Sequence, residues 1–253
     1  MSAKLKEIVE FLDEELRTGE VPDYPGALNG LQLENDGTVT KVGSAVDATL
    51  PVIRKALAAG VDLLVVHHGL FWQGAERITG SYYEKLSNAI AGNLAIYSSH
   101  IPLDLHPVHG NNALLASKLA DCEWEDYFDF KGVKLGKRTN LKITVGELAK
   151  RLEAAVGTSL LRGPVEPERP AGQVGLITGG AGSEIGQMKT LGINTFISGE
   201  APHWAAGIAE ESGVQLLLGG HYATETFGVR ALEELVAKRF GMDSEAIHHP
   251  SFL

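Results

Sequence analysis

The sequence predicts an α/β protein of two similar halves, each with a mixed or parallel sheet covered by helices. Apolar runs of strand length alternate with amphipathic stretches of helix length along most of the 253 residues, which is the pattern of repeated βαβ units. Many of the 30 glycines fall where an expected strand gives way to an expected helix. Functional sites of α/β proteins are commonly built at such junctions.

The first half is expected over residues 1–125. It begins with an amphipathic helix at 4–17, where apolar side chains recur at helical spacing. Glycine, proline and asparagine then predict a loop at 23–37. A strand at 39–46 leads to a helix at 49–60, because proline suits its first turn and glycine its end. Strands and helices then alternate at 61–66, 81–91, 94–98 and 111–120.

Residues 126–172 are expected to connect the halves. Charges, aromatic residues and glycines interrupt the pattern there and leave room for one short strand at most. A helix is predicted at 145–156, and the segment 163–172, rich in proline, glycine and arginine, resembles a linker. The second half, 173–253, resumes the α/β alternation, and the three parts are expected to pack as a single compact unit. Its expected elements lie at 174–178, 184–191, 194–198, 201–212, 214–218 and 223–239.

The two halves carry matching polar segments. In each, a strand is followed by two small residues, a histidine, three further residues and a carboxylate. The first example runs from His100 to Asp104 and the second from His221 to Glu225. This correspondence favours an internal duplication, although βαβ units also resemble one another by chance.

Composition excludes several classes of protein. The formal net charge is −10, so the surface repels phosphate backbones and broad nucleic-acid binding is not expected. No apolar run is long enough to span a membrane, and the first residues lack the apolar region of a secretory signal. The single cysteine, Cys122, fits a reducing compartment. A cytoplasmic protein is therefore expected.

Three expected strands end in residues that bind metal ions. We predict that two divalent ions are held by five residues: His67, His68, Asp104, His221 and Glu225. Imidazole and carboxylate donors suit Fe, Zn, Mn or Co rather than calcium. Five ligands for two ions require a bridge, from Glu225 or Asp104, and leave positions for water or substrate. Neighbouring residues of a strand point to opposite faces, so His67 and His68 cannot easily bind one ion within a strand. At the strand end, next to Gly69, the two rings could diverge and each hold a different ion.

Other polar residues are candidates for roles beside the metal. Glu200 and His203 could carry protons or orient a ligand, or be only a carboxylate at a helix start and a surface histidine. His100 is expected to orient a ligand. The glycine-rich segment that contains Gly180, Gly182 and Ser183 could bind a phosphate at a helix start. A plain turn between strand and helix is favoured there, because neither a dinucleotide fingerprint nor a P-loop lysine is present.

Several segments together resemble the GTP cyclohydrolase I type 2 homologue family, also called NIF-three-like (NGG-one interacting factor three-like). The matching segments are 29–32, 45–49, 60–68, 99–104, 198–200 and 220–225. The chain differs at Gly69, where the family often has proline, and it lacks the middle domain of longer members. Neither difference affects a predicted ligand.

The resemblance implies a more specific site. His68 and Asp104 would hold one ion, His67 and His221 the other, and Glu225 would bridge them in a cleft between the two halves. It also implies a homohexamer, a ring of dimers whose sites face an internal cavity.

The function expected from these features is that of a metal-dependent hydrolase. A metal-bound hydroxide would attack a nucleotide-like or other small polar substrate. Two alternatives remain open. One is a non-catalytic, metal-binding ring that serves as a scaffold, and the other is a GTP cyclohydrolase, which rests on the family name alone.

Overall fold

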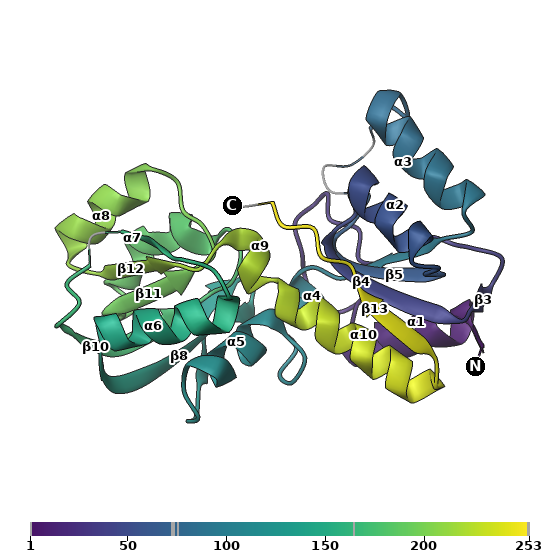
Figure 1. The fold of residues 1–253 in the computed structure, drawn as a ribbon. Coiled ribbons are helices and arrows are strands. Elements are labelled where there is room, and N and C mark those ends of the chain that lie inside the picture. Colours follow the sequence, from purple (N-terminus) through teal and green to yellow (C-terminus); the bar gives the residue numbers. More distant parts are fainter. Residues whose placement is uncertain (1, 72–73, 75, 164, 252–253) are drawn as a thin grey trace. The chain divides into compact units, whose positions relative to one another are not determined.

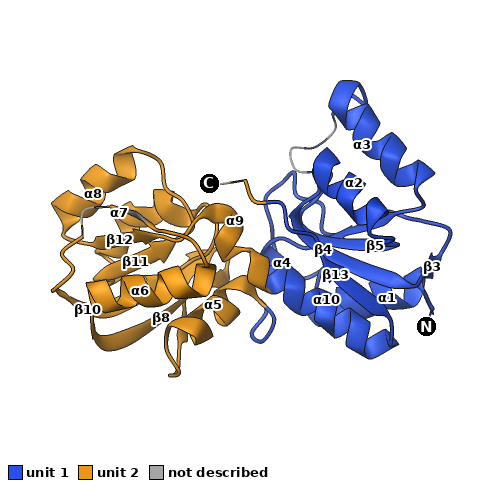
Figure 2. Cartoon of the chain, in the orientation of Figure 1, with its two compact units in different colours: residues 1–109, 228–249 blue, residues 110–227, 250–253 orange. Residues whose placement is uncertain are grey.

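The chain forms two compact units, seen in a computed structural model (Figure 1). The structure describes residues 2–71, 74, 76–163 and 165–251. Unit 1 comprises residues 1–109 and 228–249, and unit 2 comprises residues 110–227 and 250–253 (Figure 2). Each unit has its own mixed sheet with helices against it, which confirms the predicted fold class of two α/β halves.

Unit 1 contains a five-stranded sheet in the order β13-β4-β5-β6-β2. Strands β13, β4, β5 and β6 are parallel, and β2 adds antiparallel to β6. Its elements are β1 (Ala3–Lys4), α1 (Leu5–Leu16), β2 (Gly30–Leu33), β3 (Thr38–Val39), β4 (Lys41–Asp47), α2 (Leu50–Ala58), β5 (Leu63–His68), α3 (Gly80–Ala91), β6 (Ala95–Ser98), α4 (Ile101–Asp104), most of α10 (Thr226–Phe240) and β13 (Asp243–Ala246).

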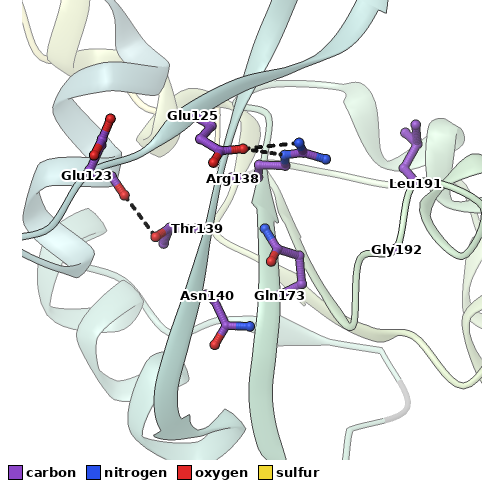
Figure 3. Close-up of a pocket in the computed structure, with 8 residues that line it drawn as sticks. All are labelled: Glu123, Glu125, Arg138, Thr139, Asn140, Gln173, Leu191 and Gly192. Carbon is purple, nitrogen blue, oxygen red and sulfur yellow. Dashed lines mark hydrogen bonds and ion pairs between the residues drawn. The ribbon is translucent and has the colours of Figure 1, made fainter.

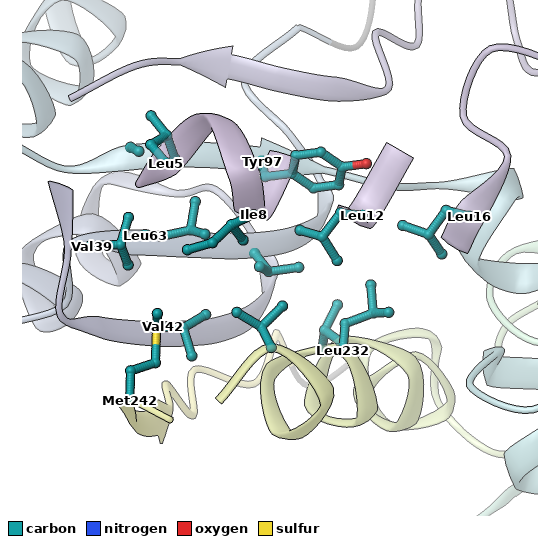
Figure 4. Packing of buried hydrophobic residues seen from close by; sticks show 14 of the residues in the cluster. Leu5, Ile8, Leu12, Leu16, Val39, Val42, Leu63, Tyr97, Leu232 and Met242 are labelled. Atoms are coloured by element: carbon teal, nitrogen blue, oxygen red, sulfur yellow. The ribbon is translucent and has the colours of Figure 1, made fainter. Parts of the chain in front are cut away.

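Helices cover both faces of this sheet, so its central strands are apolar on both sides. Leu63 and Val65 of β5 pack with α1 and α10 (Figure 4). Leu64 and Val66 pack with α2 and α3 on the other face. Alternate side chains of a strand point to opposite faces, which explains why the continuous apolar run predicts a doubly covered strand.

Unit 2 contains a six-stranded sheet in the order β7-β8-β10-β11-β12-β9. Strands β10, β11 and β12 are parallel, whereas β7, β8 and β9 are added antiparallel at its two sides. Its elements are α5 (Asn111–Leu119), β7 (Glu125–Phe130), β8 (Val133–Thr144), α6 (Val145–Val156), β9 (Leu161–Arg162), β10 (Pro170–Leu176), the 3-10 turn η1 (Ala181–Glu184), α7 (Ile185–Met188), β11 (Thr195–Ser198), α8 (Trp204–Ser212), β12 (Gln215–Leu218) and α9 (His221–Thr224).

Two helix pairs are associated with the second sheet. Helices α5 and α6 bury Leu115, Leu148 and Leu152 against strand residues that include Ile197 and Leu217. The neighbouring strand residues point to the other face of the sheet. Helices α7 and α8 lie on that side (Figure 1). The three parallel strands β10, β11 and β12 with their connecting helices repeat the arrangement of β4, β5 and β6.

The boundaries differ from those predicted. Residues 126–172 are not a connector, because β7, β8, α6, β9 and the start of β10 lie there and belong to the second sheet. The end of the chain returns to unit 1: β13 pairs with β4, and α10 buries Val229, Leu232 and Val236 in the first core. Both differences arise from pairing between distant segments, which local sequence patterns do not show.

One aromatic side chain of β7 packs closely against the neighbouring strands. Tyr127 is buried against two glycines of neighbouring strands. A Cβ atom at Gly136 would lie 2.5 Å from the Tyr127 ring, and one at Gly175 would collide with its hydroxyl. The missing side chains of these glycines therefore make the space that Tyr127 fills, although glycine weakens a strand pattern in the sequence.

Candidate metal centre

In unit 1 the parallel strands bring three histidines to one edge of the sheet. His67 and His68 end β5, and His100 directly precedes α4, shortly after the end of β6. The carboxyl ends of neighbouring parallel strands open at the same edge. His67 is fully buried, and His100 is only 8% exposed. These residues are therefore part of the folded framework, with little freedom to move.

The three imidazoles form one cluster. A possible ligand atom from each lies within 4.8 Å of those of the other two. The ring centroids of His67 and His68 are 4.8 Å apart, and those of His67 and His100 are 4.9 Å apart. The structure thus brings the adjacent rings of His67 and His68 side by side, with 46° between their planes. His68 is the last residue of its strand, so its side chain need not follow the strict alternation of a strand interior.

Each imidazole in this cluster is oriented by an oxygen atom. The Nδ1–H group of His67 donates to the carbonyl oxygen of Ser99 at 2.9 Å. That of His68 donates to Asp47 Oδ1 at 2.8 Å, and that of His100 donates to Asp23 Oδ1 at 2.8 Å. A carbonyl or carboxylate oxygen can only accept, so these contacts assign the proton to Nδ1. Nε2 is then the nitrogen with a lone pair for a ligand.

Asp23 is the centre of a network that holds His100. Its second oxygen accepts from the Asn29 amide at 2.8 Å and from the backbone N–H of Ile101 at 3.1 Å. Asn29 in turn accepts from the backbone N–H of His100 at 2.8 Å. Burial works to raise the pKa of Asp23, but the hydrogen bonds from His100 and Asn29 outweigh it and hold the pKa below its usual value. For His100, burial dominates and lowers the pKa, against the hydrogen bond to Asp23.

Asp104 adds a carboxylate to the same part of unit 1. It ends the short helix α4, which begins directly after His100, and is 6% exposed. Its Oδ2 atom lies 3.6 Å from His67 Nε2. Two atoms of types that can bind a metal ion therefore lie close together, on the side of His67 that faces away from Ser99.

In unit 2 the sequence-predicted residues also lie together. His221 begins α9 and Glu225 follows its last residue, with a break in the helix before α10. The predicted single helix 223–239 is thus two helices, yet His221 Nε2 still lies 3.1 Å from Glu225 Oε2. Glu200 Oε1 accepts from His221 Nδ1 at 2.9 Å. Burial alone would lower the pKa of His221, but Glu225 and Glu200 raise it to about 9.

Close backbone packing explains the glycines around this group. Gly179 has a φ of +67°, and its carbonyl oxygen accepts from the backbone N–H groups of Gly199 and Glu200. A Cβ atom on Gly199 would lie 2.7 Å from that oxygen and 2.8 Å from the Cα atom of His221. The loops that follow β10 and β11 can therefore approach α9 only because these residues lack side chains.

The other predicted residues of unit 2 are less closely associated with His221. The backbone N–H of Gly182 donates to the carbonyl oxygen of Glu200 at 3.0 Å, so it is not available to a phosphate. Gly180 and Ser183 lie at a 3-10 turn followed by a four-residue helix. A helix this short presents few aligned N–H groups to an anion. His203 is exposed at the start of α8 and makes none of the described contacts to Glu200 or His221.

Sequence reasoning missed the residues that orient the imidazoles. These are Asp23, Asn29, Asp47 and the carbonyl of Ser99. Asp47 had a usable signal, since it ends the strand next to β5 and is paired in register with His68. Asp23 had none, because it is 77 residues from His100 in a segment that predicts only a loop.

A separate hollow lies on unit 2, away from these residues. Its volume is about 450 Å³, and it is lined by Glu123, Glu125, Arg138, Thr139, Asn140, Gln173, Leu191 and Gly192 (Figure 3). Among these residues, Arg138 donates two hydrogen bonds to Glu125, its neighbour on the paired strand. None of the predicted metal ligands lines this hollow.

In the part of the chain that is described, no helix is long and apolar enough to cross a membrane.

The fold and the buried histidine and carboxylate residues define a class: a two-unit α/β protein with side chains that could bind a metal ion. The family model Duf34/NIF3 (NGG1p interacting factor 3) matches residues 3–250. The chain therefore belongs to the Duf34/NIF3 family.

Relatives with names or structures support this assignment. The chain is 36% identical over 250 residues to a GTP cyclohydrolase 1 type 2 homolog of Deinococcus radiodurans, covering 98% of this chain and 94% of that protein. It is 34% identical over 250 residues to the Escherichia coli K12 protein of the same name, covering 98% and 99%.

Two solved structures match along nearly the whole chain. Protein ybgI, described as of unknown function, has a TM-score of 0.88 at 34% identity and covers 99% of this chain and 100% of its own. TTHA1606 from Thermus thermophilus has a TM-score of 0.81 at 35% identity, with the same coverage.

Proposed function

We propose that this protein is a metal-dependent hydrolase that holds two divalent ions. The ligands in this proposal are His67, His68, Asp104, His221 and Glu225. One observation carries it: in both units, the Nδ1–H of each of these histidines donates to a carboxylate or carbonyl oxygen. Such a partner fixes the tautomer and makes Nε2 a better donor to a metal ion. A histidine that serves only packing does not require this arrangement at every position.

The donor set fits divalent Fe, Zn, Mn or Co. It combines imidazole nitrogens with carboxylate oxygens and contains no thiolate, since Cys122 lies outside it and is exposed. Two such ions lower the pKa of coordinated water and stabilise negative charge on a substrate. Mixed nitrogen and oxygen donors with few ligands per ion are typical of catalytic rather than structural sites.

Glu200 is the residue best placed to accept a proton. Its side chain is 46% exposed, while one carboxylate oxygen is bonded to His221. It can therefore orient His221 and also exchange a proton with solvent. His203 is a weaker candidate, because it is exposed and lies outside the described contacts of His221.

The substrate proposed is a nucleotide-like or other small polar molecule. Relatives carry the name GTP cyclohydrolase 1 type 2 homolog, which makes opening of the guanine ring of GTP a specific candidate reaction. The formal charge of −10 argues against a nucleic acid as the substrate. We also propose a cytoplasmic homohexamer built as a ring of dimers, which sedimentation or light scattering of the purified protein would test.

Turnover by defined metal forms tests the hydrolase proposal. Metal-free protein is loaded separately with Mn, Zn, Fe or Co and assayed on nucleotides, phosphoesters and cyclic amides, with product analysis after incubation with GTP. His68→Ala is the inactive comparison, and His248→Ala is the matched control because it removes a histidine near the end of the chain. At least one metal form of the wild-type protein should turn over a substrate clearly faster than His68→Ala loaded with the same metal. Full metal occupancy without turnover on any substrate would contradict the proposal and favour a metal-binding scaffold.

A further inference from the structure

We infer that Tyr24 is a substrate-recognition residue whose ring stacks on the planar heterocyclic base of a nucleotide. The inference rests on the nucleotide-like substrate proposed above and adds the residue that recognises its base. It requires neither a bound metal ion nor hydrolysis, so its test does not depend on turnover.

Tyr24 presents a large aromatic side chain beside the histidines of unit 1. The residue is 49% exposed, although its ring centroid lies 5.8 Å from that of His100, with 38° between the ring planes. Two other exposed aromatic residues, Tyr83 and Trp204, are 59% and 51% exposed. Within the described ranges, neither of them makes a ring contact with a histidine. Tyr24 therefore combines exposure with a position next to the candidate site.

Hydrogen bonds hold the backbone of Tyr24 in place. Its N–H group donates to Asp23 Oδ1 at 2.6 Å, and the same oxygen accepts from His100 Nδ1 at 2.8 Å. Its carbonyl oxygen accepts from the backbone N–H of Ala27 at 3.0 Å. Pro25 follows directly, and the backbone of a residue before proline is restricted. The main chain at Tyr24 is therefore tied to the carboxylate that also holds the ring of His100.

The loop that carries Tyr24 is also anchored at its other end. The backbone N–H of Leu28 donates to the carbonyl oxygen of Phe71 at 3.4 Å. The Gln32 amide donates to the carbonyl oxygen of Leu28 and accepts from the backbone N–H of Leu70, both at 2.6 Å. Leu28 itself is 51% exposed. One exposed apolar residue is ordinary, but two on a loop anchored at both ends offer a surface that a ligand can cover.

A tyrosine ring in a fixed position suits a planar ligand. An aromatic side chain stacks on any base, because every base has a flat π face. Tyrosine has only two side-chain torsions, so little conformational entropy is lost when its ring is covered. Asp23 and Asp47 accept hydrogen bonds from the histidines here, and their carboxylates oppose an anion. An uncharged base therefore adds binding free energy that this negative charge does not oppose.

The test compares guanosine 5′-monophosphate with ribose 5-phosphate, which lacks the base. Equilibrium dialysis against the whole chain, metal-free and loaded with zinc, gives a dissociation constant for each ligand. Proton NMR follows the H8 signal of the base, which a stacked aromatic ring shifts upfield. Tyr24→Ala removes the ring, Tyr24→Leu keeps an apolar side chain without a π face, and Tyr24→Trp keeps an aromatic ring. Tyr83→Ala is the matched control, because it removes an exposed tyrosine from α3. Circular dichroism establishes that each variant is folded.

We expect the wild-type protein to bind guanosine 5′-monophosphate more tightly than ribose 5-phosphate. Tyr24→Ala and Tyr24→Leu should weaken binding of the nucleotide at least about 5-fold and abolish the upfield shift, with the affinity for ribose 5-phosphate unchanged. Tyr24→Trp and Tyr83→Ala should retain both the preference and the shift.

Three results would overturn the inference. The wild-type protein could bind the two ligands equally, or Tyr24→Ala could leave their affinity ratio unchanged. Tyr24→Ala could also weaken both ligands by the same factor, which would assign the ring a structural role in the loop. Preserved discrimination without turnover on any substrate would contradict the hydrolase proposal and support the role of Tyr24.

Discussion

Asp47 offers a direct test of the proposed metal site, because it accepts a hydrogen bond from the proposed ligand His68 and is not itself a proposed ligand. Its Oδ1 atom accepts from His68 Nδ1 at 2.8 Å. The substitution Asp47→Ala removes this acceptor and leaves every proposed ligand in place. Loss of such a partner lowers metal affinity by about 10- to 100-fold, which corresponds to about 1.4–2.7 kcal/mol of binding free energy. We expect the lower end, because the side chains of Asp47 and His68 are 33% and 20% exposed and water can replace part of the contact.

Competition with a chromophoric zinc chelator would measure this effect on metal-free protein. Asp47→Asn should fall between wild type and Asp47→Ala, because an amide oxygen still accepts from the ring but carries no charge. Asp129→Ala is the control, since it removes an exposed carboxylate whose partner, Lys134, lies at the β7–β8 hairpin. Unchanged zinc affinity in Asp47→Ala would refute the reasoning: either His68 is not a ligand, or its ring is held by other contacts.

Three further outcomes are expected. Gly175→Ala should lower the free energy of unfolding measured in urea by about 1–3 kcal/mol, because the new Cβ collides with the Tyr127 hydroxyl. Adding Tyr127→Phe should recover part of this loss, and no recovery would place the strain elsewhere. Leu232→Ala should lower the free energy of unfolding by about 2–5 kcal/mol and speed amide hydrogen exchange in β4 and β5, since this fully buried side chain packs in the core of unit 1. Faster exchange confined to unit 2 would contradict this placement. Glu200→Gln should weaken metal binding about 10-fold, whereas His203→Ala should leave it unchanged; equal effects of the two would argue against the contact to His221.

The sequence predicted the parts of the fold that depend on local pattern. The apolar run before His67 is a strand covered on both faces, and its neighbours alternate with helices as expected. The polar residues at the ends of these strands lie together because parallel neighbours place their carboxyl ends at one edge. Strand periodicity and the position of the histidines relative to it were therefore enough to predict that the unit 1 candidates lie close together.

The unit boundaries needed the tertiary structure. The hairpin β7–β8 joins the second sheet through the antiparallel pairing of β8 with β10, and Tyr127 fills space left by Gly136 and Gly175. This aromatic–glycine packing is invisible locally, because glycine and charged residues argue against a strand when read alone. Likewise, β13 pairs with β4 about 200 residues earlier in the chain, and no short-range pattern reports such a pairing.

The sequence by itself determined which strands end in histidine and carboxylate residues, since that follows from residue type and periodicity. Only the tertiary structure decided how those residues are oriented. Asp23 reaches His100 across 77 residues of chain, and the ring of His68 turns toward that of His67 with Asp47 behind it. A ligand's tautomer and direction depend on hydrogen bonds to distant segments. The folding of the whole unit supplies them.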